Sequence, residues 1–157
     1  MLNTIKNGKL YGSNYSFDLP KGFNRVEGLH FIKDDDLVFV STDNENVQIA
    51  IYFETECHSA KDDTQKLFDD NPSLIKMSNY VSVKRGQGVG IGILCENKFG
   101  ATQHYYERYD FEKNEYGVTQ LFIDIIMCAT RRVYIPTIQE VLELPTVKAF
   151  LESIEYY

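Results

Sequence analysis

The sequence predicts an α+β domain in which a twisted antiparallel sheet of about six to seven strands carries helices packed on it. Segments that alternate apolar and polar residues, the pattern of a half-buried strand, are more numerous than segments with helical periodicity. Four of them follow one another between the two predicted helical regions, and the connections at residues 97–101 and 112–117 are short enough for antiparallel hairpins. Because strands and helices do not alternate regularly, a parallel doubly wound sheet is disfavoured.

Composition favours one folded domain spanning residues 1–157. Hydrophobic residues make up 43% of the chain and charged residues 25%, which is enough apolar material for a core and excludes intrinsic disorder. Gly is 10 and Pro only 4, so a collagen-like or low-complexity chain is excluded as well.

The N-terminal part is expected to consist of strands. They are predicted at residues 15–19, 30–33, 37–41 and 47–54, each with an alternating or short β-like pattern. The triplets 20–22 and 34–36 have turn-forming composition.

Helices are expected in two places. Ser59 is a candidate N-cap of the first, with acidic residues in its first turn, and Asn71–Pro72 ends it. In the C-terminal region, Thr137 and Glu140 have capping-box spacing, and Pro145 suits a helix start. The apolar residues that follow have i, i+3, i+4, i+7 spacing, namely Val147, Phe150, Leu151 and Ile154.

Between the helices, four strands are predicted at residues 80–84, 89–96, 102–111 and 118–127. One face of the last strand is wholly apolar and is expected to meet the helices: Leu121, Ile123, Ile125 and Met127. Its other face is mixed and includes Asp124. The sheet is therefore expected to have one dry face and one half-polar, tyrosine-rich face.

Charge and cysteine content limit the partners and the compartment. With a net charge of -7 and no run of Lys or Arg longer than two residues, binding to nucleic acid or to anionic membranes is disfavoured. Cys57, Cys95 and Cys128 are odd in number and well separated, which favours reduced thiols. No apolar stretch reaches the roughly 18 residues of a membrane span, and the N-terminal segment lacks the apolar core of a signal peptide. A cytoplasmic location is expected, with a trimmed secretion signal as the open alternative.

Two terminal motifs resemble the PsbP-like and DcrB-like domains. Tyr15–Phe23 (YSFDLPKGF) is similar to their opening aromatic strand followed by Pro and Gly, although Phe23 stands where relatives commonly carry Trp. Val147–Ile154 (VKAFLESI) is similar to their closing segment. The resemblance implies an α/β/α-like sandwich around a twisted antiparallel sheet. It also implies a non-catalytic accessory, assembly or chaperone role.

The sequence offers few candidates for catalysis. The glycine-rich segment 85–92 lacks the Lys-Ser/Thr of a phosphate-binding loop and is followed by strand-like residues, so its alternating glycines are expected to admit a helix or large aromatic rings, or to leave a shallow groove. Cys57 and His58 are adjacent and point to opposite faces of a strand, which works against a nucleophilic pair. His30, His58 and His104 lack metal-ligand spacing. No metal and no cofactor are expected.

Carboxylates within strands are a second group of candidates. Asp124 interrupts an apolar strand, and a buried carboxylate must be paired or have a raised pKa. Arg108 and Arg131 are its expected partners, and an exposed position on the mixed face is the alternative. Glu54 and Glu56 are expected to lie at a solvated strand end.

Tyrosine is the most unusual feature of the composition, with 11 residues and no Trp. Tyr and Arg are enriched at recognition surfaces, while strands also favour aromatic residues for packing. A binding face is predicted from Tyr52, His104, Tyr106 and Arg108, or from the alternates Tyr105 and Tyr109.

The predicted function is that of a non-catalytic accessory protein, an assembly factor or chaperone, that recognises a protein segment through this face. Two alternatives remain open. One is a small enzyme or ligand carrier with a pocket between sheet and helix, built around Asp124 or around Cys57 and His58. The other is an acidic immunity-type protein that neutralises a basic toxin.

Overall fold

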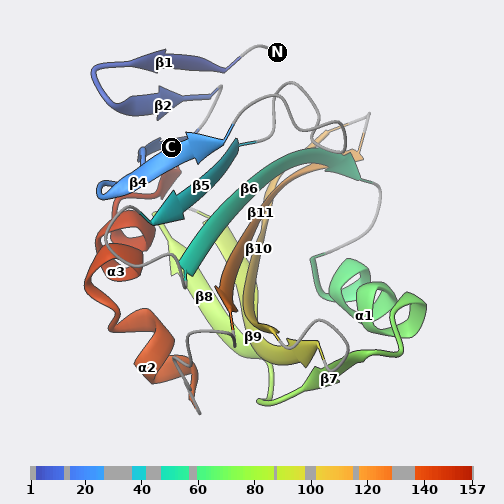
Figure 1. Ribbon diagram of the computed structural model, residues 1–157. Coiled ribbons are helices and arrows are strands. Elements are labelled where there is room, and N and C mark those ends of the chain that lie inside the picture. Colours follow the sequence, from blue (N-terminus) through green and yellow to red (C-terminus); the bar gives the residue numbers. More distant parts are fainter. Residues whose placement is uncertain are drawn as a thin grey trace.

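Two antiparallel sheets and three helices make up the part of the chain that the structure describes (Figure 1). The structure is a computed structural model, and it describes residues 3–12, 15–26, 37–41, 47–56, 60–86, 88–97, 102–114, 117–128 and 137–156.

The larger sheet has eight strands in the order β4-β5-β6-β11-β10-β9-β7, with β8 also paired to β9. Its strands are β4 (Phe23–Val26), β5 (Leu37–Ser41), β6 (Val47–Glu56), β7 (Leu74–Lys76), β8 (Val81–Arg85), β9 (Gly88–Asn97), β10 (Thr102–Asn114) and β11 (Gly117–Cys128). All of its neighbours pair antiparallel, which confirms the predicted fold class. The sheet is slightly larger than expected, because β4 and β7 were not predicted. The strand predicted at residues 30–33 lies outside the described residues.

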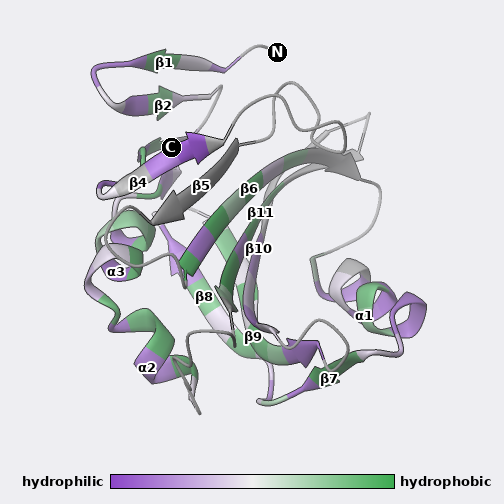
Figure 2. Cartoon of the chain, viewed as in Figure 1, coloured by the Kyte–Doolittle hydropathy of each residue, from purple (hydrophilic) through white to green (hydrophobic). Residues whose placement is uncertain are grey.

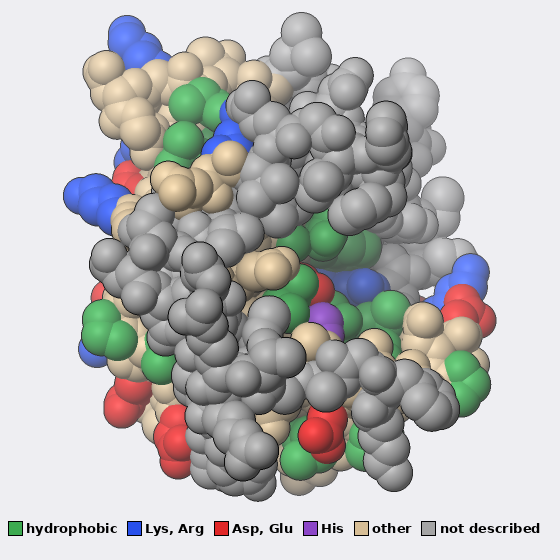
Figure 3. Space-filling model, in the orientation of Figure 1, with side chains coloured by type: hydrophobic (Ala, Val, Ile, Leu, Met, Phe, Trp, Pro, Cys, Tyr) green, Lys and Arg blue, Asp and Glu red, His purple; other side chains and the backbone are tan. Residues whose placement is uncertain are grey.

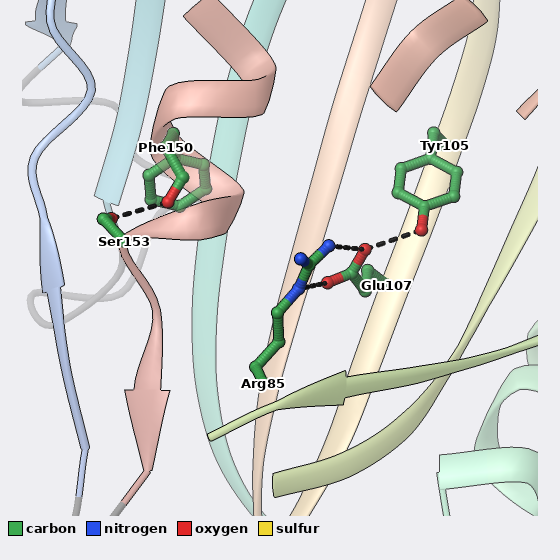
Figure 4. A network of polar contacts seen from close by, with 5 residues as sticks. All are labelled: Arg85, Tyr105, Glu107, Phe150 and Ser153. Carbon is green, nitrogen blue, oxygen red and sulfur yellow. Dashed lines mark hydrogen bonds and ion pairs between the residues drawn. The ribbon is translucent and has the colours of Figure 1, made fainter. Parts of the chain in front are cut away.

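A second sheet, which the sequence analysis did not anticipate, joins the two ends of the chain. It has the order β1-β2-β3-β12, from β1 (Thr4–Lys6), β2 (Lys9–Tyr11), β3 (Tyr15–Asp18) and β12 (Glu155–Tyr156). Asn7 and Gly8 connect β1 and β2 with φ angles of 52° and 73°, the positive values that a two-residue hairpin turn requires. Ser153 attaches the chain end to β3, since its Oγ accepts from the Asp18 N–H at 3.0 Å. The same Oγ donates to the Phe150 carbonyl at 2.6 Å (Figure 4).

The helices lie on opposite sides of the larger sheet (Figure 1). α1 (Ala60–Asp70) packs against β9 and β10 on one side, and α2 (Ile138–Leu142) and α3 (Pro145–Glu152) lie on the other. The predicted capping box is confirmed, because Thr137 Oγ1 accepts from the Glu140 N–H at 3.2 Å, and Pro145 begins α3 as expected. Hydrophobic and hydrophilic residues alternate along all three helices, as in amphipathic helices (Figure 2). None of the helices described is long and apolar enough to cross a bilayer.

The main core lies between the larger sheet and α2 and α3. The apolar face predicted for β11 is confirmed: Leu121, Ile123, Ile125 and Met127 are at most 1% exposed and cluster with side chains of both helices. The second sheet closes this core, because Phe17 of β3 meets Phe150 of α3 edge to face, with ring centroids 5.8 Å apart.

A buried ion pair sits at the edge of this core. The Glu107 side chain is 0% exposed and accepts hydrogen bonds from Arg85 Nε at 3.0 Å, Arg85 Nη2 at 3.3 Å and the Tyr105 hydroxyl at 2.6 Å (Figure 4). These bonds satisfy a carboxylate that would otherwise be costly to bury.

The glycines of β9 explain how large rings fit over the sheet. A Cβ at Gly92 would collide with the Tyr105 ring and hydroxyl, and a Cβ at Gly88 would collide with the Tyr156 ring. Aromatic packing was one of the three roles expected for this stripe, and the structure supports that role.

We predict that Gly92→Ala lowers the free energy of unfolding by about 1–3 kcal/mol, because the added methyl group forces the Tyr105 ring out of place. Chemical denaturation measures this cost. In a Tyr105→Leu background the same change should cost less, and an equal cost in both backgrounds would show that the ring is not what the glycine accommodates.

We predict that Glu107→Ala lowers the free energy of unfolding by about 3–5 kcal/mol, more than Gly92→Ala does. The change leaves Arg85 without its buried counter-ion and the Tyr105 hydroxyl without its acceptor. Glu143→Ala, at an exposed helical position, is the matched control and should stay within about 0.5 kcal/mol of the parent. Urea denaturation of both variants gives the comparison, and equal losses would contradict the assignment.

Candidate functional site

The pleat of β10 sends successive side chains to opposite sides of the larger sheet. Tyr105 and Glu107 are buried on the side of α2 and α3. Tyr106 packs with Phe68 of α1 and Ile93, so it lies on the other side. His104 and Arg108 are two residues away from Tyr106 along the strand and share its face.

Four of the six predicted binding residues therefore lie on one face, which we call the α1-side face. In the register of the sheet, Arg108 is opposite Phe122, and Phe122 is in turn opposite Tyr52. The α1-side face is formed by Tyr52, His104, Tyr106, Arg108, Phe122 and Asp124. Tyr105 is not part of it, since it is 0% exposed on the opposite side, and the Tyr109 side chain lies outside the described residues.

A chain of hydrogen bonds runs across this face. His104 Nδ1 lies 3.0 Å from Asp124 Oδ1, and His104 Nε2 lies 2.8 Å from Thr102 Oγ1. The side chains of His104 and Asp124 are each 12% exposed. Thr102 is half-buried at the first position of β10.

Asp124 was expected to pair with Arg108 or Arg131. Among the described residues its carboxylate makes a hydrogen bond with His104, not with Arg108. Burial raises the pKa of Asp124, while the His104 hydrogen bond and the charges of His104 and Arg108 act in the opposite direction. Arg131 lies outside the described residues.

Aromatic contacts hold the rest of the face in place. The His104 and Tyr106 rings are stacked with centroids 5.4 Å apart and an interplanar angle of 11°. The Arg108 guanidinium lies 3.9 Å from the centre of the Phe122 ring, a cation–π contact. Burial, followed by the charge of Asp124, raises the pKa of the Tyr106 hydroxyl, which therefore stays protonated.

Helix α1 covers one end of the face. Phe68, Ile93 and Cys95 form a small cluster, with Leu74, Tyr80 and Tyr106 packed around it. Burial and the Asp124 charge raise the pKa of the Cys95 thiol to about 12, which disfavours a reactive thiolate there. Beside α1, hydrophobic, carboxylate, imidazole and cationic side chains show together at the floor of a hollow (Figure 3).

The other chemical candidates form no metal-binding group among the described residues or lie outside them. Among the described residues, no group of three or more His, Cys, Asp and Glu side chains is placed to hold a metal ion. Cys57, His58 and His30 lie outside the described part of the chain, and so do the side chains of Glu54 and Glu56.

The alternative function of a small enzyme or ligand carrier requires a pocket between sheet and helix. One pocket of about 270 Å³ lies beside α2 and α3, and Arg85, Gln139, Leu142, Glu143, Lys148, Leu151 and Glu152 line it. It contains neither Asp124 nor any residue of the α1-side face, and the guanidinium of Arg85 is already bound to Glu107.

Two members of the site were missed from the sequence. Thr102 was placed at a strand start without a role, and Phe122 was assigned only to a mixed face. The spacing of Thr102 and His104, two residues apart on one strand, places both on one face. That signal was present, but the contact with Asp124 depends on the register of β11.

Comparison with known proteins shows a shared fold. The solution structure of cyanobacterial PsbP (CyanoP) from Synechocystis sp. PCC 6803 matches with a TM-score of 0.57 and 12% identity, over 95% of this chain and 91% of that one. A crystal structure of a protein from Bacteroides thetaiotaomicron matches with a TM-score of 0.47 and 12% identity, over 91% of this chain and 45% of that one. No protein-family model matches the chain, and no curated protein does. The chain therefore has a PsbP-like fold, as its terminal motifs predicted.

Proposed function

We propose that this chain is a non-catalytic accessory protein that binds a segment of a protein partner on the α1-side face. The observation that carries the proposal is the grouping of Tyr52, Tyr106 and Arg108, all partly exposed, on one side of the sheet. Tyr and Arg are the residues that contribute most often to binding energy at protein interfaces.

The rigidity of these side chains supports the proposal. Tyr106 is stacked on His104, and Arg108 is held over Phe122, so both are already ordered before a partner arrives. Ordering a flexible side chain on binding costs about 0.5–1.5 kcal/mol. Side chains that are already fixed avoid that cost.

The fold adds support of a general kind. The resemblance to PsbP-like domains implies an accessory role, and the similarity in fold to cyanobacterial PsbP agrees with that resemblance. A hollow bordered by a helix also suits an extended segment better than a flat partner surface, since the side chains of such a segment can enter it.

We expect the double variant Tyr106→Ala/Arg108→Ala to lose the native partner that the parent protein retains in affinity purification from the source cell, with capture read by mass spectrometry. For the partner so identified, calorimetry should give a Kd at least about thirty-fold weaker, the effect of losing roughly 2 kcal/mol at a central contact. Arg108→Ala alone leaves the packing of Tyr106 intact and should weaken binding with little change in Tm.

The matched control is Lys9→Ala/Tyr11→Ala. Lys9 Nζ lies 5.9 Å from the centre of the exposed Tyr11 ring, so this pair removes one cation and one tyrosine from β2, in the other sheet. Binding should survive in the control. If the partner is retained by folded Tyr106→Ala/Arg108→Ala, or is lost equally from both double variants, the α1-side face is not the binding surface.

A further inference from the structure

Thr102, His104 and Asp124 form a continuous chain of hydroxyl, imidazole and carboxylate. The hydroxyl oxygen is 2.8 Å from one ring nitrogen, and the carboxylate oxygen is 3.0 Å from the other. Thr102 and His104 are two residues apart on β10 and so point to one side, and the pairing of Tyr106 with Asp124 brings β11 alongside. The strand register thus places all three groups without a contribution from loops.

The two hydrogen bonds of the His104 ring suit base chemistry in the tautomer that carries its proton on Nδ1. In that tautomer His104 Nδ1–H donates to Asp124 Oδ1, and the lone pair on Nε2 accepts the hydroxyl proton of Thr102. This order, with the carboxylate holding the imidazole and the imidazole acting as base toward a hydroxyl, is the arrangement that activates hydroxyl nucleophiles.

Exposure and packing suit the same role. The His104 ring is held against Tyr106, and Asp124 is nearly buried, so the base keeps one orientation. Thr102 is half-buried at the start of β10, whereas Asp124 is buried.

We propose that Thr102 is a covalent acyl-acceptor site for acyl donors with a good leaving group, such as activated esters and thioesters. Thr102 Oγ attacks the carbonyl carbon while its proton passes to His104 Nε2. The bond from carbon to the leaving group then breaks, and the leaving group takes the proton from His104. The product is a threonyl ester with His104 neutral again, and no electrons are gained or lost overall.

The acyl-acceptor site lies on the same face as the proposed binding surface but rests on different functional groups. Binding depends on Tyr106 and Arg108, whereas acyl transfer depends on Thr102 and His104. The two proposals are tested with different variants and different measurements, so the failure of one is distinguishable from the failure of the other.

The test uses the whole chain and p-nitrophenyl acetate as the probe. Acid-quenched early samples are analysed by peptide mass spectrometry for acetylation of Thr102, and release of p-nitrophenolate is followed in parallel. Thr146, exposed on α3, is the internal reference for an unactivated threonine. Acetylation of Thr102 is expected to exceed that of Thr146 by about a hundredfold, the lower end of what a positioned general base contributes.

Variants separate activation from simple exposure. The release of p-nitrophenolate that is due to Thr102 should be abolished by Thr102→Val and preserved by Thr102→Ser. The matched control Thr146→Val should leave this release unchanged. His104→Ala should lower acetylation of Thr102 about a hundredfold, and added imidazole should restore part of it. Circular dichroism establishes that each variant is folded.

The overturning results are equally specific. If Thr102 is acetylated no faster than Thr146, or if Thr102→Val and the parent release p-nitrophenolate at the same rate, the hydroxyl is not activated. Should His104→Ala prove unfolded, the comparison of Thr102→Val with Thr102→Ser decides alone. If the hydroxyl is not activated, the three side chains only satisfy one another's hydrogen bonds.

Discussion

The antiparallel pairing of β10 with its two neighbours is the constraint on which the rest of the structure depends. Because side chains alternate along a strand, a slip of one residue would move Glu107 out of the core and bring Arg108 into it. Two features oppose such a slip. Gly92, opposite Glu107 in the register, leaves the space that the Tyr105 ring fills, and Arg85 holds Glu107 from β8. The position of the α1-side face thus follows from packing on the other side of the sheet.

The two faces of the larger sheet each bury a carboxylate, and they satisfy it differently. Glu107 is enclosed by a guanidinium and a phenol. Asp124 is bonded to a histidine whose second nitrogen meets the half-buried Thr102. The first arrangement supports the fold, since a buried ion pair with one partner removed is strongly destabilising. The second connects a buried carboxylate, through an imidazole, with the hydroxyl of a half-buried residue.

The sequence predicted the strands, the helices and the faces better than it predicted contacts between strands. Period-two patterns located β6 and β9 to β11, and the capping box located α2, because these signals are local. The Asn7–Gly8 turn was an equally local signal and was overlooked. The pairing of β12 with β3 was beyond such patterns, since it joins residues at opposite ends of the chain.

In the candidate site, a register shift between Asp110 and Lys113 determines which residue of β11 lies opposite Tyr106. Extended without that shift, the turn pairing of Asn114 with Gly117 would set Tyr106 opposite Ile125 instead of Asp124.

The position of Asp124 is the strongest reason to regard the α1-side face as more than packing. Its neighbours two residues away in sequence are Phe122 and Ile126, and an apolar residue there would avoid the desolvation that raises the pKa of the carboxyl. Arg85 accounts for the burial of Glu107, whereas among the described residues Asp124 makes its hydrogen bond with an imidazole. The carboxylate holds the imidazole in one orientation, and the second ring nitrogen of the imidazole faces a hydroxyl. Asp124 therefore orients polar groups on the α1-side face, which is what either recognition or acyl transfer at this face requires.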